Sequence, residues 1–428
     1  MNDNLMNPSG LTKFLLHIHP QKVNKQTLIF SRTFGLGGIN ALLFLILALT
    51  GTLLRFSYVA SPVGAYNSIV DLQNHSLFGS LLRNIHHWSA MLMVVASFLH
   101  LLRVFLSQSI YYERKRTWYY GLAMFILVLA FNFTGYLLPW DQLSFWAVTI
   151  MTNIISYFPF FGGALADIIR GGEMVNQNTL LNFYTFHTAL LPLFFVFLMI
   201  MHFWLIRKAK GVTHTNQGEQ KMVRVNPELI SREIIAALIL IALILVFSMI
   251  FNAPLLEKAN PTQSPNPSKA PWYFMGIQEL LINVHPFFAT FIIPFSLFAF
   301  LLCIPTVRID KSKVGQWFYS KKGKKTIIFS ILFSVFLTIL LVIVLNKFIV
   351  LINLTLPTVI STGLIPFLMY CLPVLGFVLY LKQSLKIDKV ELIISLMATF
   401  ITSYLVMSII GIWFRGESMN LIFWTKFI

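Results

Sequence analysis

Four histidines lie in two apolar segments of the sequence at nearly equal spacings. His86 and His100 are 14 residues apart in one segment, and His187 and His202 are 15 residues apart in another. At 100° and 1.5 Å per helical residue, the members of each pair return to within about 40° and 60° of the same face and lie about 21 and 22 Å apart. Each segment therefore presents two imidazoles on one face at two depths.

These imidazoles predict two metal sites stacked across a membrane. Both segments are expected to enter the membrane from the same side, which pairs His86 with His187 near the outer face and His100 with His202 near the inner face. Because imidazoles can ligate the iron of a porphyrin, we expect two non-covalent b-type haems. The alternative is that the histidines only form hydrogen bonds between helices, although a titratable ring inside a membrane segment is by default a functional candidate.

Glycines at a 14-residue spacing occur in two neighbouring apolar segments. They are Gly37 and Gly51 in one segment and Gly121 and Gly135 in the other. Glycine has no Cβ and so allows the backbone to approach a flat macrocycle closely. Small residues also serve plain helix packing, so these glycines support the haem hypothesis without carrying it.

Three arginines lie beside the histidine segments and are candidates for binding the haem groups. Arg83 lies one turn before the first histidine, Arg103 lies three residues after the second, and Arg207 follows the fourth apolar segment. Arg83 and Arg103 have the charge needed to pair with haem propionates. The alternative for both is that their side chains extend along apolar surface to reach the membrane interface.

The composition requires that membrane-spanning helices position these residues. Of the 428 residues, 57% are hydrophobic and only 11% are charged, with a mean hydropathy of +0.76. Soluble proteins contain about 25% charged residues, so a soluble enzyme, a disordered chain and a coiled coil are excluded. Cys303 and Cys371 lie inside apolar segments, which excludes a disulfide framework and a cysteine-ligated cluster.

About nine segments are apolar and long enough to cross a bilayer, which takes about 20 helical residues. We expect an all-α membrane protein whose first four spans form a four-helix bundle around the two haems. The predicted spans are 34–54, 83–105, 118–138, 183–206, 234–251, 286–304, 326–345, 364–381 and 392–414. No secretory signal is visible, so the first span is expected to be retained.

The net charge of +17 indicates membrane topology. If the N-terminus is cytoplasmic, 24 of the 32 Lys and Arg residues fall in five inside segments and 8 fall outside. This is the asymmetry of the positive-inside rule. Nucleic-acid binding is unsupported, because the charge is spread over separate loops without a binding module.

Four motifs resemble the cytochrome b/b6 family. They are the run 83–90 followed by His100 and Arg103, the run 135–142 with its Pro-Trp-Asp-Gln sequence, the run 183–188 followed by Leu191-Pro192, and Ala270-Pro-Trp-Tyr-Phe274. The likeness extends from about Thr33 to Pro305. The 15-residue histidine spacing is more similar to the b6 branch than to the mitochondrial one.

The resemblance implies a cytochrome b subunit of a bacterial quinol:cytochrome c oxidoreductase. Such a subunit oxidises quinol at an outer site and passes electrons through two b haems to an inner quinone site, with coupled proton translocation. Its implied partners are a Rieske iron–sulfur protein, a c-type cytochrome and the quinone pool, in a homodimeric complex of the bacterial plasma membrane. The expected divisions are a cytoplasmic segment 1–33, a dihaem domain 34–210, a quinol-site domain 211–325 like subunit IV, and three further helices in 326–428.

The sequence departs from the family pattern at three positions. Gly35 stands where the b6 branch commonly carries the cysteine that tethers an extra haem, so we expect no covalent c-type haem. His87 stands where the b6 pattern has Arg. Pro271 replaces the Glu of the family's Pro-Glu-Trp-Tyr segment, and proline cannot accept a proton.

The quinol site must therefore use another proton acceptor. A carboxylate in a partly apolar setting is a suitable base. Our candidate is Glu279, which has Ile277, Leu280 and Leu281 as apolar neighbours in a short helix expected at the membrane surface. Asp141 of the Pro-Trp-Asp-Gln loop is the competing base. The Tyr273 hydroxyl is expected to orient the quinol ring, and the resemblance places Trp272 at the same site.

Two other functions fit parts of the pattern. A simpler dihaem membrane anchor of a respiratory dehydrogenase or reductase would explain the haems without needing the Pro-Trp and Trp-Tyr loops. A transporter with midplane histidines is less consistent, because the sequence contains no inverted repeat.

Overall fold

The computed structural model describes residues 22–209, 211–212, 221–353 and 356–422. Nine helices in these residues are long and apolar enough to cross a membrane, which confirms the predicted fold class. They are α3 (Leu36–Arg55), α5 (Gly79–Leu106), α6 (Lys115–Leu137), α10 (Leu191–Lys208, preceded by α9 Gln177–Thr185 and η3 Phe186–Leu190), α11 (Val225–Ile250), α13 (Ile293–Cys303, preceded by η5 Phe288–Ile292), α14 (Lys321–Asn353), α15 (Ile365–Gln383, preceded by η8 Val359–Leu364) and α16 (Lys389–Trp413).

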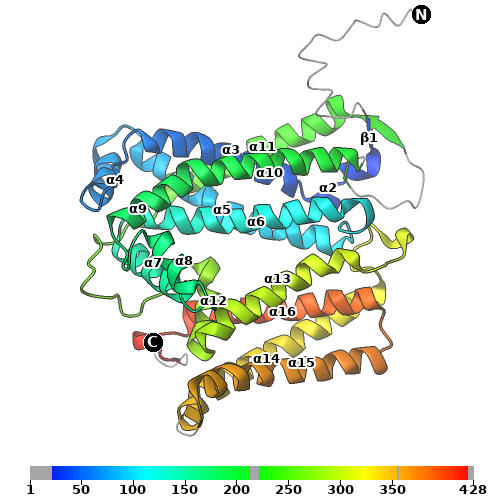
Figure 1. The fold of residues 1–428 in the computed structure, drawn as a ribbon. Coiled ribbons are helices and arrows are strands. Elements are labelled where there is room, and N and C mark those ends of the chain that lie inside the picture. The colour runs from blue at the N-terminus through cyan, green and yellow to red at the C-terminus, as the bar shows by residue number, and fades with distance from the viewer. Residues whose placement is uncertain (1–21, 210, 213–220, 354–355, 423–428) are drawn as a thin grey trace, which may run out of the picture.

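The first four spanning helices form one bundle. Helix α3 packs on α5, α5 on α6, and α6 on α10 (Figure 1). Their shared core contains Leu43, Met93, Val128 and Phe195, one from each helix. Helix α11 lies against α5 and α3 and adds Leu240 and Ile244 to that core. The fifth span thus packs on the first bundle, although the expected division at 210 assigned it to the following unit.

The later helices form a second group. Helix α16 packs against α14 and also against α12 (Met275–Asn283), while α15 covers α14 and α16 (Figure 1). Between α14 and α16, Ser403 bonds to Ser334 and Thr338, and Tyr370 of α15 reaches the same hydroxyl. The three helices expected as additions after residue 325 are therefore packed on the segment that precedes them.

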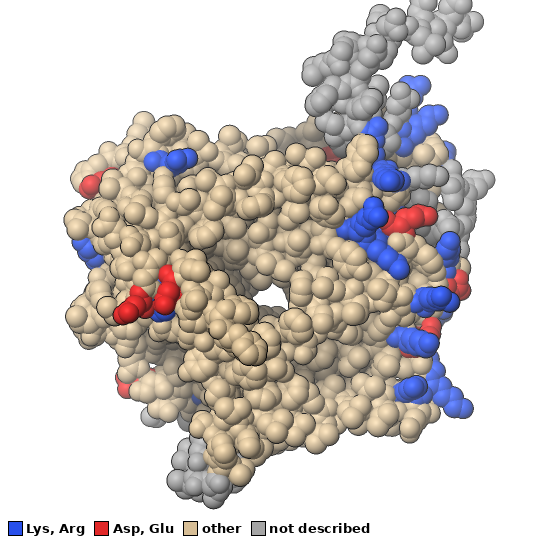
Figure 2. Space-filling model, in the orientation of Figure 1, with Lys and Arg blue, Asp and Glu red and all other residues tan. Residues whose placement is uncertain are grey.

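The two groups meet at both ends of the helices. At one end the Trp118 indole donates to the Leu301 carbonyl, over 2.9 Å. At the other end the rings of Phe133 and Phe274 meet with centroids 6.1 Å apart. Between these contacts the space-filling view shows an opening through the molecule (Figure 2).

Lys and Arg gather at one end of the helical body, which we call the basic end (Figure 2). It contains a small antiparallel sheet of β1 (Lys22–Asn24) and β2 (Met222–Arg224), the short η1 (Lys25–Leu28) and α2 (Phe30–Thr33), and the turns η2 (Tyr112–Arg114), η6 (Ile304–Thr306) and η7 (Lys311–Lys313). The opposite end, which we call the loop end, contains α4 (Gly64–His75), α7 (Gln142–Ile155), α8 (Gly162–Arg170), η4 (Trp272–Phe274), α12 and η9 (Glu417–Met419).

Three spanning helices contain a wider π-helical turn near one end, and each turn is followed by proline. The turns η3, η5 and η8 precede Pro192, Pro294 and Pro366 by two residues. Proline lacks the N–H that would bond to the carbonyl four residues earlier, and its ring crowds that carbonyl. A π turn moves this carbonyl out of the α-helical pattern and accommodates one extra residue.

Candidate functional site

The loop-end histidines, His86 of α5 and His187 of η3, face each other across the bundle. Their ring centroids are 6.3 Å apart and their planes are inclined by 72°. Two metal–imidazole bonds of about 2 Å, together with the radii of two five-membered rings, span about 6 Å. The separation therefore fits one metal ion between the rings.

Hydrogen bonds assign the proton on each of these rings. His86 Nδ1 lies 2.9 Å from Thr50 Oγ1, whose own hydrogen is donated to the Ile46 carbonyl. His187 Nδ1 lies 3.1 Å from the carbonyl oxygen of Phe131, which can only accept, and 3.2 Å from Thr134 Oγ1. Both Nδ1 atoms therefore donate, which leaves the Nε2 lone pairs for a metal.

The histidine and glycine spacings did not indicate Thr50 and Thr134. Each directly precedes one of the predicted glycines, so the dipeptide Thr-Gly occurs once in α3 and once in α6. That repeated dipeptide at the level of the outer histidines was the available signal.

The basic-end histidines are His100 of α5 and His202 of α10, and the Nδ1 atom of each is buried without a hydrogen-bond partner among the described residues. The π turn at η3 explains how the two helices match in depth. The Leu191 N–H bonds to the Phe186 carbonyl five residues back, so η3 takes up one extra residue next to His187. The 15-residue spacing in this helix is therefore equivalent to 14 residues of regular α-helix. In both helices the two histidine rings then lie within about 40° of one face and about 21 Å apart along the axis.

The four glycines lie against the four imidazoles. We expected them to face a macrocycle, and in the structure each lies beside one of the four histidine rings. A Cβ added at each glycine would lie 3.6 Å (Gly37) from His100, 3.1 Å (Gly51) from His86, 3.3 Å (Gly121) from His202 and 2.6 Å (Gly135) from His187, measured to Cε1. Alanine at position 135 would therefore displace its histidine, whereas at position 37 it would make an ordinary contact.

Among the described residues, no cluster of three or more His, Cys, Asp or Glu side chains could hold a metal ion. Paired imidazoles therefore suit a metal whose other ligands come from a bound group, as in a porphyrin. The apolar core of Leu43, Met93, Val128 and Phe195 lies midway in sequence between the two levels of histidines. This core separates the two sites.

The candidate propionate-binding arginines differ in their contacts. Both terminal nitrogens of Arg83 donate to backbone carbonyls, those of Ala253 and Pro254, at 2.8 and 2.6 Å. Arg103 is buried and donates through Nε to the Arg32 carbonyl at 2.7 Å. Arg207 lies in the last turn of α10 at the basic end. Arg83 thus fastens the connection after α11, a role that its sequence position did not indicate.

Asp141 is buried at the start of α7 and holds two segments together. One carboxylate oxygen accepts the Ser144 N–H at 2.9 Å, which caps the helix, and the other accepts the Leu256 N–H at 3.2 Å. The adjacent Gln142 bonds to the backbone of residues 257, 260 and 263. The Pro-Trp-Asp-Gln loop is thereby joined to the connection that leads to Trp272.

The Trp272–Tyr273 turn packs against the first bundle, whose apolar core includes Tyr273, and against α12 and α16. Tyr273 is buried, and its hydroxyl has no hydrogen-bond partner among the described residues. Burial raises the pKa of this hydroxyl, so it stays protonated and can donate. Trp272 is exposed, and its indole N–H donates to the sulfur of Met91 over 3.3 Å.

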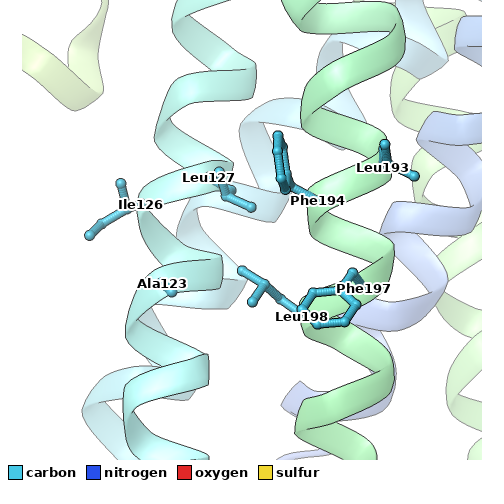
Figure 3. Close-up of a pocket in the computed structure, with 7 residues that line it drawn as sticks. All are labelled: Ala123, Ile126, Leu127, Leu193, Phe194, Phe197 and Leu198. Atoms are coloured by element: carbon cyan, nitrogen blue, oxygen red, sulfur yellow. The ribbon is translucent and has the colours of Figure 1, made fainter.

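One hollow lies beside the Trp272–Tyr273 turn, and another lies between two helices of the first bundle. A cavity of about 30 Å³ between α7 and α12 is lined by residues that include Met151, Phe274 and Gln278. A wider hollow of about 560 Å³ lies between α6 and α10, lined by seven apolar side chains (Figure 3). Leu127, Phe194 and Leu198 lie between the two helices there, and the lining offers no group for proton or electron transfer.

Glu279 is fully buried in α12, a short helix at the loop end, as the sequence predicts a short helix for this segment. Its two oxygens accept from Arg415, over 2.5 Å from Nη2 and 2.9 Å from Nε, and Asn283 donates to one of them at 2.9 Å. Arg415 follows α16, in the region that no sequence motif explained. The partner of the candidate base is therefore a guanidinium 136 residues further along the chain.

Comparisons with known proteins agree with this geometry. The family model described as cytochrome b/b6/petB matches residues 22–210. Cytochrome b6 of Prochlorococcus marinus strain MIT 9515 is 42% identical over 173 residues, which cover 40% of this chain and 79% of that protein. Its counterpart in strain NATL1A is 41% identical over the same length. A solved structure titled hyperthermophilic respiratory Complex III superimposes with a TM-score of 0.68 over 92% of this chain and 98% of that chain, at 21% identity, and thus shares the fold.

Proposed function

The chain belongs to the cytochrome b/b6 family, and from this premise we propose that it is the dihaem cytochrome b subunit of a quinol:cytochrome c oxidoreductase. The observation that carries the proposal is the His86–His187 pair, with ring centroids 6.3 Å apart and both Nδ1 atoms donating. Such a pair presents two Nε2 lone pairs to one metal ion. The histidines at the basic end supply the second pair.

The residues of this chain have distinct tasks in the proposal. His86 and His187 would hold one b haem, and His100 and His202 the other; bound haem supplies one-electron transfer between the two ends of the bundle. The threonines at the loop end fix the ring orientation of their ligands. Moving one charge across the membrane is worth about 2.3 kcal/mol per 100 mV, so separated sites can convert redox energy into membrane potential.

Quinol is proposed to bind at the loop end, beside Trp272 and Tyr273. The unpartnered Tyr273 hydroxyl, which stays protonated, supports a donor role toward a quinol or quinone oxygen. Glu279 and Asp141 remain the predicted proton acceptors. Both carboxylates already accept hydrogen bonds from protein groups, so either would have to exchange a partner to take a proton from quinol.

The chain is proposed to act only inside a complex. Splitting the two electrons of a quinol requires a second acceptor. The sequence has only two cysteines, both in membrane helices, so a partner must supply an iron–sulfur cluster or a c-type haem. We propose a Rieske protein, a c-type cytochrome and a homodimeric assembly in a bacterial plasma membrane.

The test is a reduced-minus-oxidised visible spectrum of the purified complex with single histidine variants. His86→Ala and His187→Ala should remove the loop-end haem, and His100→Ala and His202→Ala the basic-end haem, because one imidazole alone cannot keep the paired ligation. Substitution of His75, which is exposed in α4, is the control. Retention of two low-spin b haems in all four variants would refute the assignment.

A further inference from the structure

Helix α16 contacts the Trp272–Tyr273 turn directly. The Tyr404 hydroxyl donates to the backbone carbonyl of Tyr273 at 2.6 Å. Three residues before Trp272, the Lys269 ammonium donates to the Ile412 carbonyl at 2.8 Å. Two polar contacts thus join the turn and the segment before it to one helix.

The helix that follows the turn approaches α16 closely through two glycines. A Cβ on Gly276 of α12 would lie 2.7 Å from both the Tyr404 ring and the Ser408 hydroxyl. A Cβ on Gly411 of α16 would lie 2.5 Å from the side chain of Met275. Because neither distance leaves room for a methyl group, the spacing between α12 and α16 depends on both glycines.

A buried ion pair closes the far end of this contact. Arg415 bonds to both oxygens of Glu279, and its remaining terminal nitrogen donates to Asn346 of α14 and to the Met419 carbonyl, each at 2.9 Å. The side chains of the pair are 1% and 0% exposed. The guanidinium therefore joins α12 to α14 as well as to the end of α16.

We propose that α16 is a positioning helix for the quinol site, in which Tyr404 fixes the backbone of Tyr273 and Arg415 fixes α12 through Glu279. Holding the Tyr273 carbonyl fixes the point from which its buried, unpartnered hydroxyl extends. The proposal rests on the proposed function, because it needs quinol to bind at this turn. It gives the C-terminal helices a task in the reaction and names Tyr404 as a positioning residue.

The experiment compares Tyr404→Phe with Tyr370→Phe in the assembled, purified complex. Both changes remove one tyrosine hydroxyl from the second helix group; that of Tyr370 bonds to Ser403, next to Tyr404, and not to the quinol site. With menadiol or duroquinol as donor, Tyr404→Phe should raise KM about three- to tenfold, the effect of one lost hydrogen bond. Its haem spectrum should be unchanged, its kcat should fall less than its KM rises, and Tyr370→Phe should match the wild type.

A second pair of variants tests the same spacing by steric means. Gly411→Ala places a methyl group against Met275, whereas Gly376→Ala in α15 meets nothing within 4 Å. Gly411→Ala should raise KM and Gly376→Ala should not. Wild-type KM in both Tyr404→Phe and Gly411→Ala would overturn the positioning role, as would equal changes in test and control variants. A wild-type complex that binds haem but oxidises neither quinol would instead refute the proposed function.

Discussion

At the scale of single residues, each loop-end histidine receives a hydroxyl and a glycine from the preceding spanning helix. Thr50 and Gly51 of α3 contact His86, and Thr134 and Gly135 of α6 contact His187. Two Thr-Gly dipeptides far apart in the sequence thus make equivalent contacts. The basic-end glycines follow Leu36 and Tyr120 instead, and the Nδ1 atoms of His100 and His202 have no hydrogen-bond partner among the described residues. The two sites differ in how their ligands are oriented.

The graded glycine distances lead to a prediction for alanine variants. Gly135→Ala would place a methyl group 2.6 Å from His187 Cε1, so the ring must turn and its Nδ1 bonds to Phe131 and Thr134 are strained. We expect loss or a marked change of the loop-end haem signal, measured by redox titration of the purified complex. Gly37→Ala, with 3.6 Å to its histidine, is the matched control and should titrate like the wild type. Identical titrations for the two variants would contradict the prediction.

At the scale of elements, hydrophobic patterning was sufficient to predict the nine spans. A helix that crosses the bilayer must form its backbone hydrogen bonds within its own segment and present apolar side chains to the lipid, so its sequence alone identifies it. It could not predict the π turn at η3, which depends on how Pro192 is accommodated locally. It also could not assign α11 to the first bundle or pair Glu279 with Arg415, since these contacts depend on tertiary packing. The histidine pairs were predictable because the number of residues between two positions in a helix determines their separation along the axis and the face that they share.

The π turn at η3 can be tested by moving the extra residue. Deletion of Ala189 removes a residue from the π turn, which should become α-helical and leave His187 and His202 on one face. Deletion of Leu198 in the regular part of α10 also gives a 14-residue spacing, but it rotates His202 by about 100° relative to the preceding turns. We expect two haems after the first deletion and loss of the basic-end haem after the second, measured by pyridine haemochrome content and visible spectra. Equal haem content in the two variants would show that the π turn does not take up the extra residue between His187 and His202.

The ion pair between Glu279 of α12 and Arg415, at the end of α16, predicts that a second substitution restores the stability lost on breaking the pair. Arg415→Gln leaves a buried carboxylate without its counter-charge, which costs about 3–5 kcal/mol. The double variant with Glu279→Gln removes both charges and should recover most of that loss, as judged by thermal unfolding of the complex. A double variant as unstable as Arg415→Gln would contradict the compensation.

Glu279→Gln also tests the proton acceptor: an unchanged quinol oxidation rate and pH profile, with both haems retained, would move that role to Asp141 or to water.

At the scale of the whole molecule, the basic end indicates how the protein is oriented in the membrane. Lys and Arg gather there, and the quinol site is proposed at the opposite end (Figure 2). Cytoplasmic loops of membrane proteins carry the excess of Lys and Arg, so we expect the basic end, with the N-terminal segment, to face the cytoplasm. Quinol oxidation at the loop end would then release protons outside, in the direction that builds membrane potential.

This orientation can be measured by cysteine labelling. In a background with Cys303 and Cys371 replaced by Ser, a single cysteine is introduced at Ser312 of the basic end or at Gln263 of the loop end, both of which are exposed. A membrane-impermeant thiol reagent should label intact cells at position 263 and should reach position 312 only after the membrane is opened. The two sites control for each other, because both are exposed and differ in the end at which they lie. The opposite labelling pattern would reverse the topology and place quinol oxidation on the cytoplasmic side, where its protons would not contribute to an outward gradient.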